Sequence, residues 1–230
     1  MLRKGFQQEL QHLQDEVLVL GSVVEQALID SVEVLRQRDS EGARRLIAAD
    51  QAINEKRFAI EDEVLALIAT QQPMAGDLRT LAAVLEIITE LERMGDYAKG
   101  IARINLMLGD EPLIKPLIDI PRMAETARDM LHQALEAFVQ RDVTLARAIP
   151  AHDDEVDALY NQVYRELLTH IMADSRKIDQ ATYLLWAAHN LERTADRVIN
   201  ICERVVFTVT GEMTEMDVEE DNLIGPSGVN

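Results

Sequence analysis

Four pairs of oxygen-bearing side chains, each pair spaced four residues apart, are the residues of this sequence best suited to chemistry. Residues four apart are neighbours on the surface of a helix, so each pair would present two oxygen groups on one face. Two pairs include the Glu of a Leu-Glu-Arg triplet, and each of the other two lies one predicted helix earlier. The pairs are Asp50/Asn54, Glu92/Asp96, Asp153/Asp157 and Glu192/Asp196.

The chemistry that such oxygen-only pairs favour is the binding of a hard or intermediate cation. Carboxylate and amide oxygens suit magnesium, calcium, manganese and iron. Zinc usually takes Cys or His, and neither clusters in this sequence, so zinc is a less suited candidate. The pairs therefore predict a site for divalent or trivalent metal ions. A second interpretation stays open, in which the acids form salt bridges between bundles with the neighbouring Arg93 and Arg193.

The position of the pairs on the helical wheel adds to this prediction. At 100° per residue, Glu92 and Asp96 fall about 100° and 140° from Leu91, at the edge of the apolar stripe. Glu192 and Asp196 repeat this placement. Carboxylates beside a core are partly desolvated, and two like charges four apart destabilise a helix by about 0.2–0.5 kcal/mol. A bound cation would offset both costs.

The elements that must position these pairs are helices, because apolar residues recur at steps of three and four along nearly the whole chain. Asp39 and Asp142 supply N-caps, and Pro150 predicts a kink or a late start in the fifth helix. The proline-dense stretch 109–117 is interpreted as a linker, and 211–230 as an acidic tail that would be disordered unless contacts order it. The six predicted helices cover about 5–38, 39–70, 77–108, 122–138, 142–172 and 178–210.

Short blocks of sequence recur in the two halves of the chain at nearly constant offsets. The offset is 103 residues in the first two helices and 100 in the third, which a three-residue deletion in one turn explains. The chain is therefore predicted to be all-α, with two tandem three-helix bundles, 5–108 and 118–210, of six long antiparallel helices related by internal duplication. The matching blocks are Gln37-Arg38-Asp39 with Gln140-Arg141-Asp142, Asp50 with Asp153, and Leu91-Glu92-Arg93-x-x-Asp96 with Leu191-Glu192-Arg193-x-x-Asp196.

Charge and composition exclude several classes of function. With 23 basic and 41 acidic residues the net charge is −18, which opposes binding to nucleic acid or to an anionic membrane. No segment is apolar enough for a signal peptide or a membrane helix, and the single Cys202 cannot form an internal disulfide. A protein in the cytoplasm, without direct membrane insertion, is expected.

No catalytic machinery is visible in the sequence. It lacks a Gly-rich phosphate loop and a nucleophile elbow, so we expect a non-enzyme without an organic cofactor. A carboxylate-bridged metal enzyme or metal-storage bundle is the alternative, but it would need two Glu-x-x-His motifs, and only Glu9-x-x-His12 is present. A purely structural helical scaffold is a third interpretation, in which the repeated acids serve solubility. His189 could lie near the second-half pair, and Cys202 is expected in the core.

These motifs resemble the signatures of the PhoU family over residues 5–210. The run Gln72-Pro73-Met74-Ala75-Gly76-Asp77-Leu78-Arg79, followed by Leu91-Glu92-Arg93-Met94-Gly95-Asp96-Tyr97-Ala98, is similar to the first repeat of that family, and Leu191-Glu192-Arg193-Thr194-Ala195-Asp196-Arg197 with Asn200-Ile201 is similar to the second.

The resemblance implies a regulator of phosphate uptake rather than an enzyme. It implies a cytoplasmic homodimer that binds metal and acts as an adaptor between a phosphate ABC transporter and a sensor histidine kinase, holding the phosphate-starvation response off. Asp50, Asp153 and Asp157 match the family's second-helix motif, and Glu92, Asp96, Glu192 and Asp196 its third-helix motif. Asn54 stands where an acid is expected, so weaker binding is predicted at the first site.

Overall fold

The computed structural model describes residues 2–109 and 111–216, and within these ranges the regular structure is helical throughout. Two short 3₁₀ turns, η1 (Ile149–His152) and η2 (Ser175–Lys177), interrupt the second half. The α-helices are α1 (Leu2–Gln37), α2 (Ser40–Gln71), α3 (Ala75–Met107), α4 (Asp119–Gln140), α5 (Val143–Ala148), α6 (Asp153–Ala173) and α7 (Ile178–Thr210).

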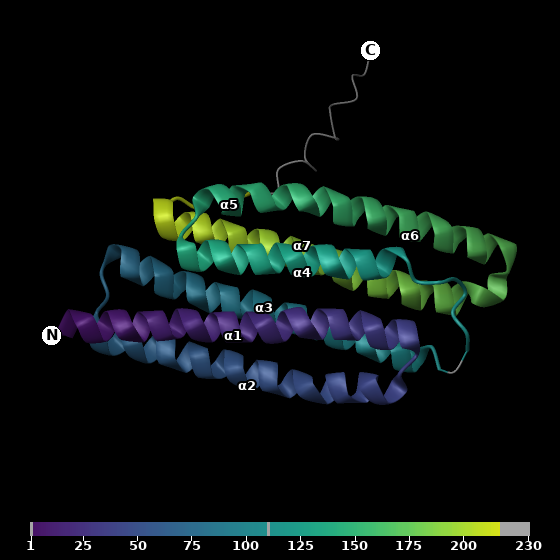
Figure 1. The fold of residues 1–230 in the computed structure, drawn as a ribbon, viewed down its shortest axis with the longest axis horizontal. Helices are drawn as coiled ribbons and strands as arrows, with labels where there is room; N and C mark the ends of the chain where they lie inside the picture. The colour runs from purple at the N-terminus through teal and green to yellow at the C-terminus, as the bar shows by residue number, and fades with distance from the viewer. Residues whose placement is uncertain (1, 110, 217–230) are drawn as a thin grey trace, which may run out of the picture.

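The helices form two bundles that lie side by side along the long axis of the molecule (Figure 1). One bundle contains α1, α2 and α3, and the other contains α4, α6 and α7, with the short α5 packed on both α4 and α7. The bundles meet where α3 packs on α7 and α1 packs on α4, and their apolar side chains form one continuous core. The prediction of an all-α fold with two tandem three-helix bundles is confirmed.

The repeated Gln-Arg-Asp block forms the same turn in both halves. Arg38 and Arg141 end α1 and α4 with positive φ angles of 59° and 56°. The following aspartates cap the next helices: Asp39 accepts a hydrogen bond from Gly42 N, and Asp142 accepts from the backbone at Thr144 and Leu145. An Asp side chain satisfies N–H groups that have no partner within the helix, so the next helix starts immediately after the turn.

The predicted fifth helix is broken at Pro150, as the missing N–H of proline requires. The chain passes from α5 through the 3₁₀ turn η1, which contains Pro150, and α6 begins at Asp153. The matching Asp50 lies well inside the unbroken α2. The break therefore places the second-repeat aspartate in the first turn of a helix, where the helix dipole favours negative charge.

The ends of the repeats differ slightly from the predicted ones. The fourth helix begins at Asp119 rather than after Pro121. Proline is tolerated in the first turn of a helix, because the N–H groups there have no partner within the helix and proline lacks this group. After α7, Met216 packs against the core and its N–H donates to Glu203 Oε1 at 2.9 Å. The rest of the predicted acidic tail, 217–230, lies outside the described residues, as does residue 110 of the linker. None of the described helices combines the length and apolar character needed to cross a membrane.

Candidate functional site

The first-repeat pairs lie on two helices that pack against each other, α2 for Asp50/Asn54 and α3 for Glu92/Asp96. Asp50 is buried, with 6% of its surface exposed, and Asp96 is half-exposed. Gly95 lets the helices approach, since a Cβ added there would lie 3.0 Å from Ile53 Cδ1 and 3.8 Å from Asp50 Oδ1. The Asp50 carboxylate therefore lies against α3 beside the Glu92/Asp96 pair.

Lys99 joins the two first-repeat pairs. Its Nζ lies 2.6 Å from Asp50 Oδ2 on α2 and 3.2 Å from Asp96 Oδ1 on α3. Asn54 Nδ2 donates to the same Asp50 oxygen at 3.1 Å. Asp50 thus receives hydrogen bonds from an ammonium and from an amide, which satisfy its charge inside the protein.

The charges of this site shift two pKa values. Burial raises the pKa of Glu92, the negative charge of Asp96 raises it further and that of Asp50 adds to the shift, whereas Arg57 opposes it. The hydrogen bond to Asp50 raises the pKa of Lys99. The first-repeat acids therefore repel one another, and the positive charge of Lys99 offsets this repulsion at Asp50 and Asp96.

The second-repeat pairs lie on α6 and α7, which also pack together. Glu192 Oε2 is 3.0 Å from His189 Nδ1, and Asp196 Oδ2 is 3.8 Å from Arg193 Nε. Burial raises the pKa of Tyr160 on α6, and the nearby charge of Glu192 raises it further. Glu192 therefore lies near Tyr160 of α6, and the third-helix pair of this repeat has His189 and Arg193 as neighbours on its own helix.

The second-helix pair of the second repeat occupies the start of α6. Asp153 is the first residue of the helix and is half-buried, and Asp157 follows one turn later and is exposed. Both aspartates make further interactions of their own with the protein. This pair stands where the helix dipole stabilises a carboxylate, unlike its counterpart within α2.

Ion pairs that join the two bundles include carboxylates outside the four acidic pairs. Arg93 Nη1 pairs with Glu90 Oε1 at 2.7 Å, and Arg197 Nη1 of α7 reaches Glu90 Oε2 at 3.5 Å. Arg204 of α7 likewise reaches Glu86 at 3.3 Å. These ion pairs between α3 and α7 therefore use Glu86 and Glu90, which precede the Glu92/Asp96 pair on α3.

No ready-made metal cage is visible among the side chains of residues 5–109 and 111–216. In this part of the chain, no group of three or more His, Cys, Asp or Glu side chains lies close enough together to hold an ion. The fold brings the pair-bearing helices into contact, and the acids there contact Lys99, Asn54, His189 and Arg193. Metal binding by the eight predicted residues stays a prediction.

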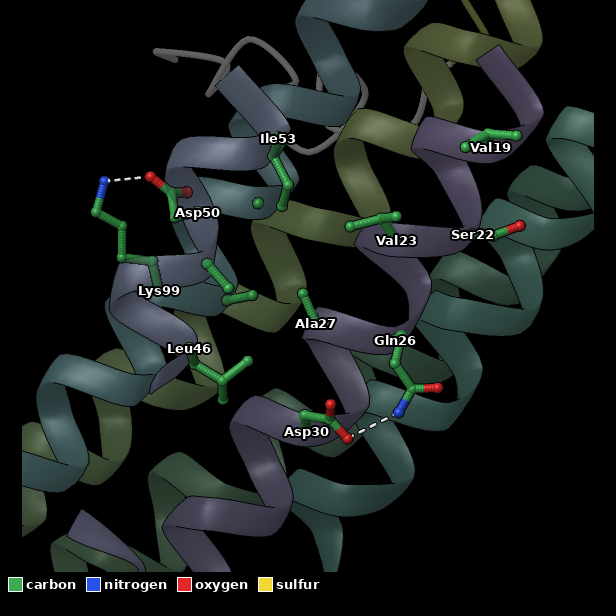
Figure 2. Close-up of a pocket in the computed structure, with 13 residues that line it drawn as sticks. Val19, Ser22, Val23, Gln26, Ala27, Asp30, Leu46, Asp50, Ile53 and Lys99 are labelled. Atoms are coloured by element: carbon green, nitrogen blue, oxygen red, sulfur yellow. Dashed lines mark hydrogen bonds and ion pairs between the residues drawn. The ribbon is translucent and has the colours of Figure 1, made fainter. Parts of the chain in front are cut away.

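An apolar groove of about 490 Å³ runs beside the first-repeat pairs, between α1, α2 and α3. Val19, Val23 and Ala27 line its α1 side, and Asp50 and Lys99 meet at its other side, as Figure 2 shows. The ion pair between Asp50 and Lys99 is therefore reached from an open groove and is not sealed in the core.

Two other residues singled out from the sequence have structural places. Cys202 is buried in the core, and this burial raises the pKa of its thiol to about 12. His12 is mainly exposed, with Nε2 3.9 Å from Glu63 on α2. The helical wheel places Lys99 one turn after Asp96, which was a signal for this residue in the sequence. Its contact with α2, and the closeness of Tyr160 to Glu192, depend on how the helices pack.

Comparison with known proteins gives matches over nearly the whole chain. A family model described as the PhoU domain matches twice, at residues 17–104 and 120–205. A protein of Clostridium acetobutylicum named phosphate-specific transport system accessory protein PhoU homolog is 35% identical, over 94% of this chain and 100% of its own. A protein of Caulobacter vibrioides with the same name is 38% identical, over 91% of both chains.

The fold has a solved counterpart as well. The crystal structure of the phosphate transport system regulatory protein PhoU from Streptococcus pneumoniae superposes with a TM-score of 0.84 at 33% sequence identity. The match covers 91% of this chain and 99% of that one. Both repeats and the contact between them are included in this coverage.

Proposed function

The chain belongs to the PhoU family, and from this premise we propose that it is a regulatory accessory protein of phosphate transport. In this role it holds the phosphate-starvation response off while phosphate is plentiful. The observation that carries the proposal is the double match to the PhoU domain, one match on each structural repeat. A relative covered over its whole length is named an accessory protein, a description typical of a non-enzyme.

The proposed mode of action is recognition by helix faces. The partners are the cytoplasmic parts of a phosphate ABC transporter and of a sensor histidine kinase, and the protein acts between them in the cytoplasm as a homodimer. With a net charge of −18, it is attracted to basic surfaces on these partners. The rate of association should fall as salt is added, because salt screens exposed charges.

A metal ion is the second part of the proposal, and the two repeats suit it unequally. In the second repeat the donor set is four carboxylates, which suits a hard cation: Asp153, Asp157, Glu192 and Asp196. A cation held between α6 and α7 would fix the spacing of these helices and with it the shape of the bundle surface. In the first repeat Asn54 reduces the charge, and Lys99 already contacts Asp50 and Asp96.

A starvation reporter in the source organism tests the regulatory role. Cells that lack the gene for this chain should express the reporter in ample phosphate, and a plasmid copy of the gene should restore repression. A variant with Glu92→Gln, Asp96→Asn, Glu192→Gln and Asp196→Asn should repress poorly while its circular dichroism shows the native helix content, because the apolar stripes are unchanged.

Two results would contradict parts of this proposal. If deletion of the gene leaves the reporter silent in ample phosphate, the chain does not control the response. If the folded quadruple variant binds no metal and still represses fully, metal is dispensable for control, and the chain regulates by its helix faces alone.

A further inference from the structure

The first-repeat acids hold an ammonium group at the place where a bridging ion would join two helices. Lys99 Nζ contacts Asp50 on α2 at 2.6 Å and Asp96 on α3 at 3.2 Å, and the side chain of Lys99 is only 20% exposed. Figure 2 shows the Asp50 contact at the edge of the groove. A metal ion between the same carboxylates would have to displace this ammonium.

We propose that Lys99 is a built-in cation that replaces a metal ion in the first repeat, so that the second repeat alone responds to metal. This inference rests on the metal part of the proposed function. It assigns metal binding to the second repeat and a lysine ammonium to the equivalent place in the first. The regulatory role is tested separately, by the reporter assay.

Two substitutions between the repeats act in the same direction at this site. Asn54 stands where the second repeat has Asp157, and Lys99 stands where it has Ile199. Three carboxylates and one ammonium therefore give the first site a net charge of −2, against −4 from the four carboxylates of the second. A divalent cation is attracted less strongly to the first site by this difference alone.

The hydrogen bonds of Asp50 strengthen the argument. Asn54 directs its Nδ2 donor to Asp50 Oδ2, the same oxygen that Lys99 contacts, so the amide supports the anion as a donor in this arrangement. Asp50 is therefore satisfied by two donors of the same chain. The ammonium is also tethered one turn from Asp96, so its local concentration is high and a free ion must compete with it.

The packing of α2 on α3 agrees with a spacing of these helices that is held without metal. Gly95 allows Ile53 to lie so close that an added Cβ would be 3.0 Å from its Cδ1, whereas the second repeat has Ala195 at the equivalent position. The spacing of the two first-repeat helices is thus set by direct side-chain contact and by the Lys99 bridge. In the second repeat the position equivalent to Lys99 is Ile199, which is apolar and buried and cannot form such an ion pair.

Binding of Mn²⁺ to the purified full chain, followed by electron paramagnetic resonance, tests the inference. All first-repeat measurements use the Asp196→Asn background, which disables the second site. In that background Lys99→Gln should bind Mn²⁺ about tenfold or more tightly than the chain with Lys99, because a positive charge in contact with two carboxylates is removed. Adding Asn54→Asp to Lys99→Gln should tighten binding again.

Lys56→Gln is the matched control. Lys56 is also partly buried and paired with an acid of another helix, but that acid is Glu16, which lies outside the first-repeat site. The substitution should leave Mn²⁺ affinity unchanged within about twofold. Thermal unfolding with and without Mn²⁺ gives a second readout, since Mn²⁺ should raise the Tm of Lys99→Gln/Asp196→Asn and leave that of Asp196→Asn unchanged.

Three outcomes would overturn the inference. Equal Mn²⁺ affinity of Asp196→Asn and of Lys99→Gln/Asp196→Asn would show that the ammonium does not block the site. Tight Mn²⁺ binding by Asp196→Asn itself, with Lys99 in place, would show the same. Lack of Mn²⁺ binding by every variant, including the unmodified chain, would overturn both this inference and the metal part of the proposed function, while the reporter assay would still decide the regulatory role.

Discussion

Glu90 on α3 and Arg197 on α7 form an ion pair across the two repeats, with 3.5 Å between Oε2 and Nη1. Arg197 Nε also lies 3.4 Å from Tyr97 Oη, which stands at the equivalent position in the first repeat. Glu90 is 9% exposed and holds Arg93 as well, at 2.7 Å. One buried carboxylate therefore holds two guanidinium groups at the contact between the bundles.

The first prediction concerns this carboxylate. Glu90→Gln should lower the free energy of unfolding by about 1–3 kcal/mol, because Arg197 would be left partly buried without a full charge partner. Glu86→Gln is the matched control: Glu86 also contacts an arginine of α7, Arg204, but its side chain is 57% exposed, so it should cost about 0–1 kcal/mol. Urea unfolding measures both, and equal losses would contradict the assigned role of Glu90.

The second prediction concerns the contact of α1 with α4. A Cβ added at Gly21 would overlap Cδ1 of the buried Leu135, so Gly21→Ala should cost about 1–3 kcal/mol despite the better helix propensity of alanine. Gly5 lies on the same helix with nothing within 4 Å of an added Cβ, so Gly5→Ala should stabilise by about 0.5–1 kcal/mol. Thermal unfolding of the two variants should shift Tm in opposite directions; a rise for Gly21→Ala would show that α4 can move away freely.

The third prediction ranks the two repeats as metal sites. Asp196→Asn should remove most of the metal bound by tag-free protein, and Asp96→Asn should remove little, because the second repeat has four carboxylates and has Ile199 at the position of Lys99. Metal content by mass spectrometry measures the difference. The ranking is wrong if Asp96→Asn loses most of the metal and Asp196→Asn little; unchanged content in both would identify the acids as a salt-bridged surface.

The fourth prediction concerns Cys202, whose thiol has its pKa raised by burial to about 12 from an ordinary 9.0. At pH 8 the folded protein should react very slowly with a thiol reagent, and unfolding in guanidinium should expose one fast-reacting thiol. Because the folded pKa is raised, the stabilising contribution of the neutral thiol is complete below pH 9 and is lost as the pH rises toward 12. The free energy of unfolding should therefore fall less steeply between pH 9 and pH 12 in Cys202→Ala than in the unmodified chain. Fast labelling of the folded protein at pH 8 would contradict the burial of the thiol.

Much of the fold could be predicted because its causes are local. Apolar residues at helical spacing mark the helices, Asp39 and Asp142 mark two of their starts, and Pro150 marks the break before α6. Each of these effects acts within a few residues of the chain. The internal offsets then require two similar bundles, which the structure shows.

The position of the acidic pairs relative to the core could also be predicted from local sequence. The helical wheel places Glu92 and Glu192 at the edge of the apolar stripe, and both are partly buried in the fold. The helical wheel predicts which side of a helix faces the core, because the 3.6-residue period is the same in every α-helix. It does not predict which residue of another helix lies opposite.

The ionic partners were decided by the tertiary structure alone. Asp50 and Lys99 are 49 residues apart in the chain, and Glu90 and Arg197 are 107 apart, so neither contact follows from any helix considered separately. The choice depends on the relative shift and rotation of packed helices, which small residues such as Gly95 and Gly21 set by allowing close approach. The sequence by itself determined the helices, their duplication and the presence of the acids; the packing determined that one acidic site contains an ammonium, because a charge pairs with whatever group the neighbouring helix brings within reach.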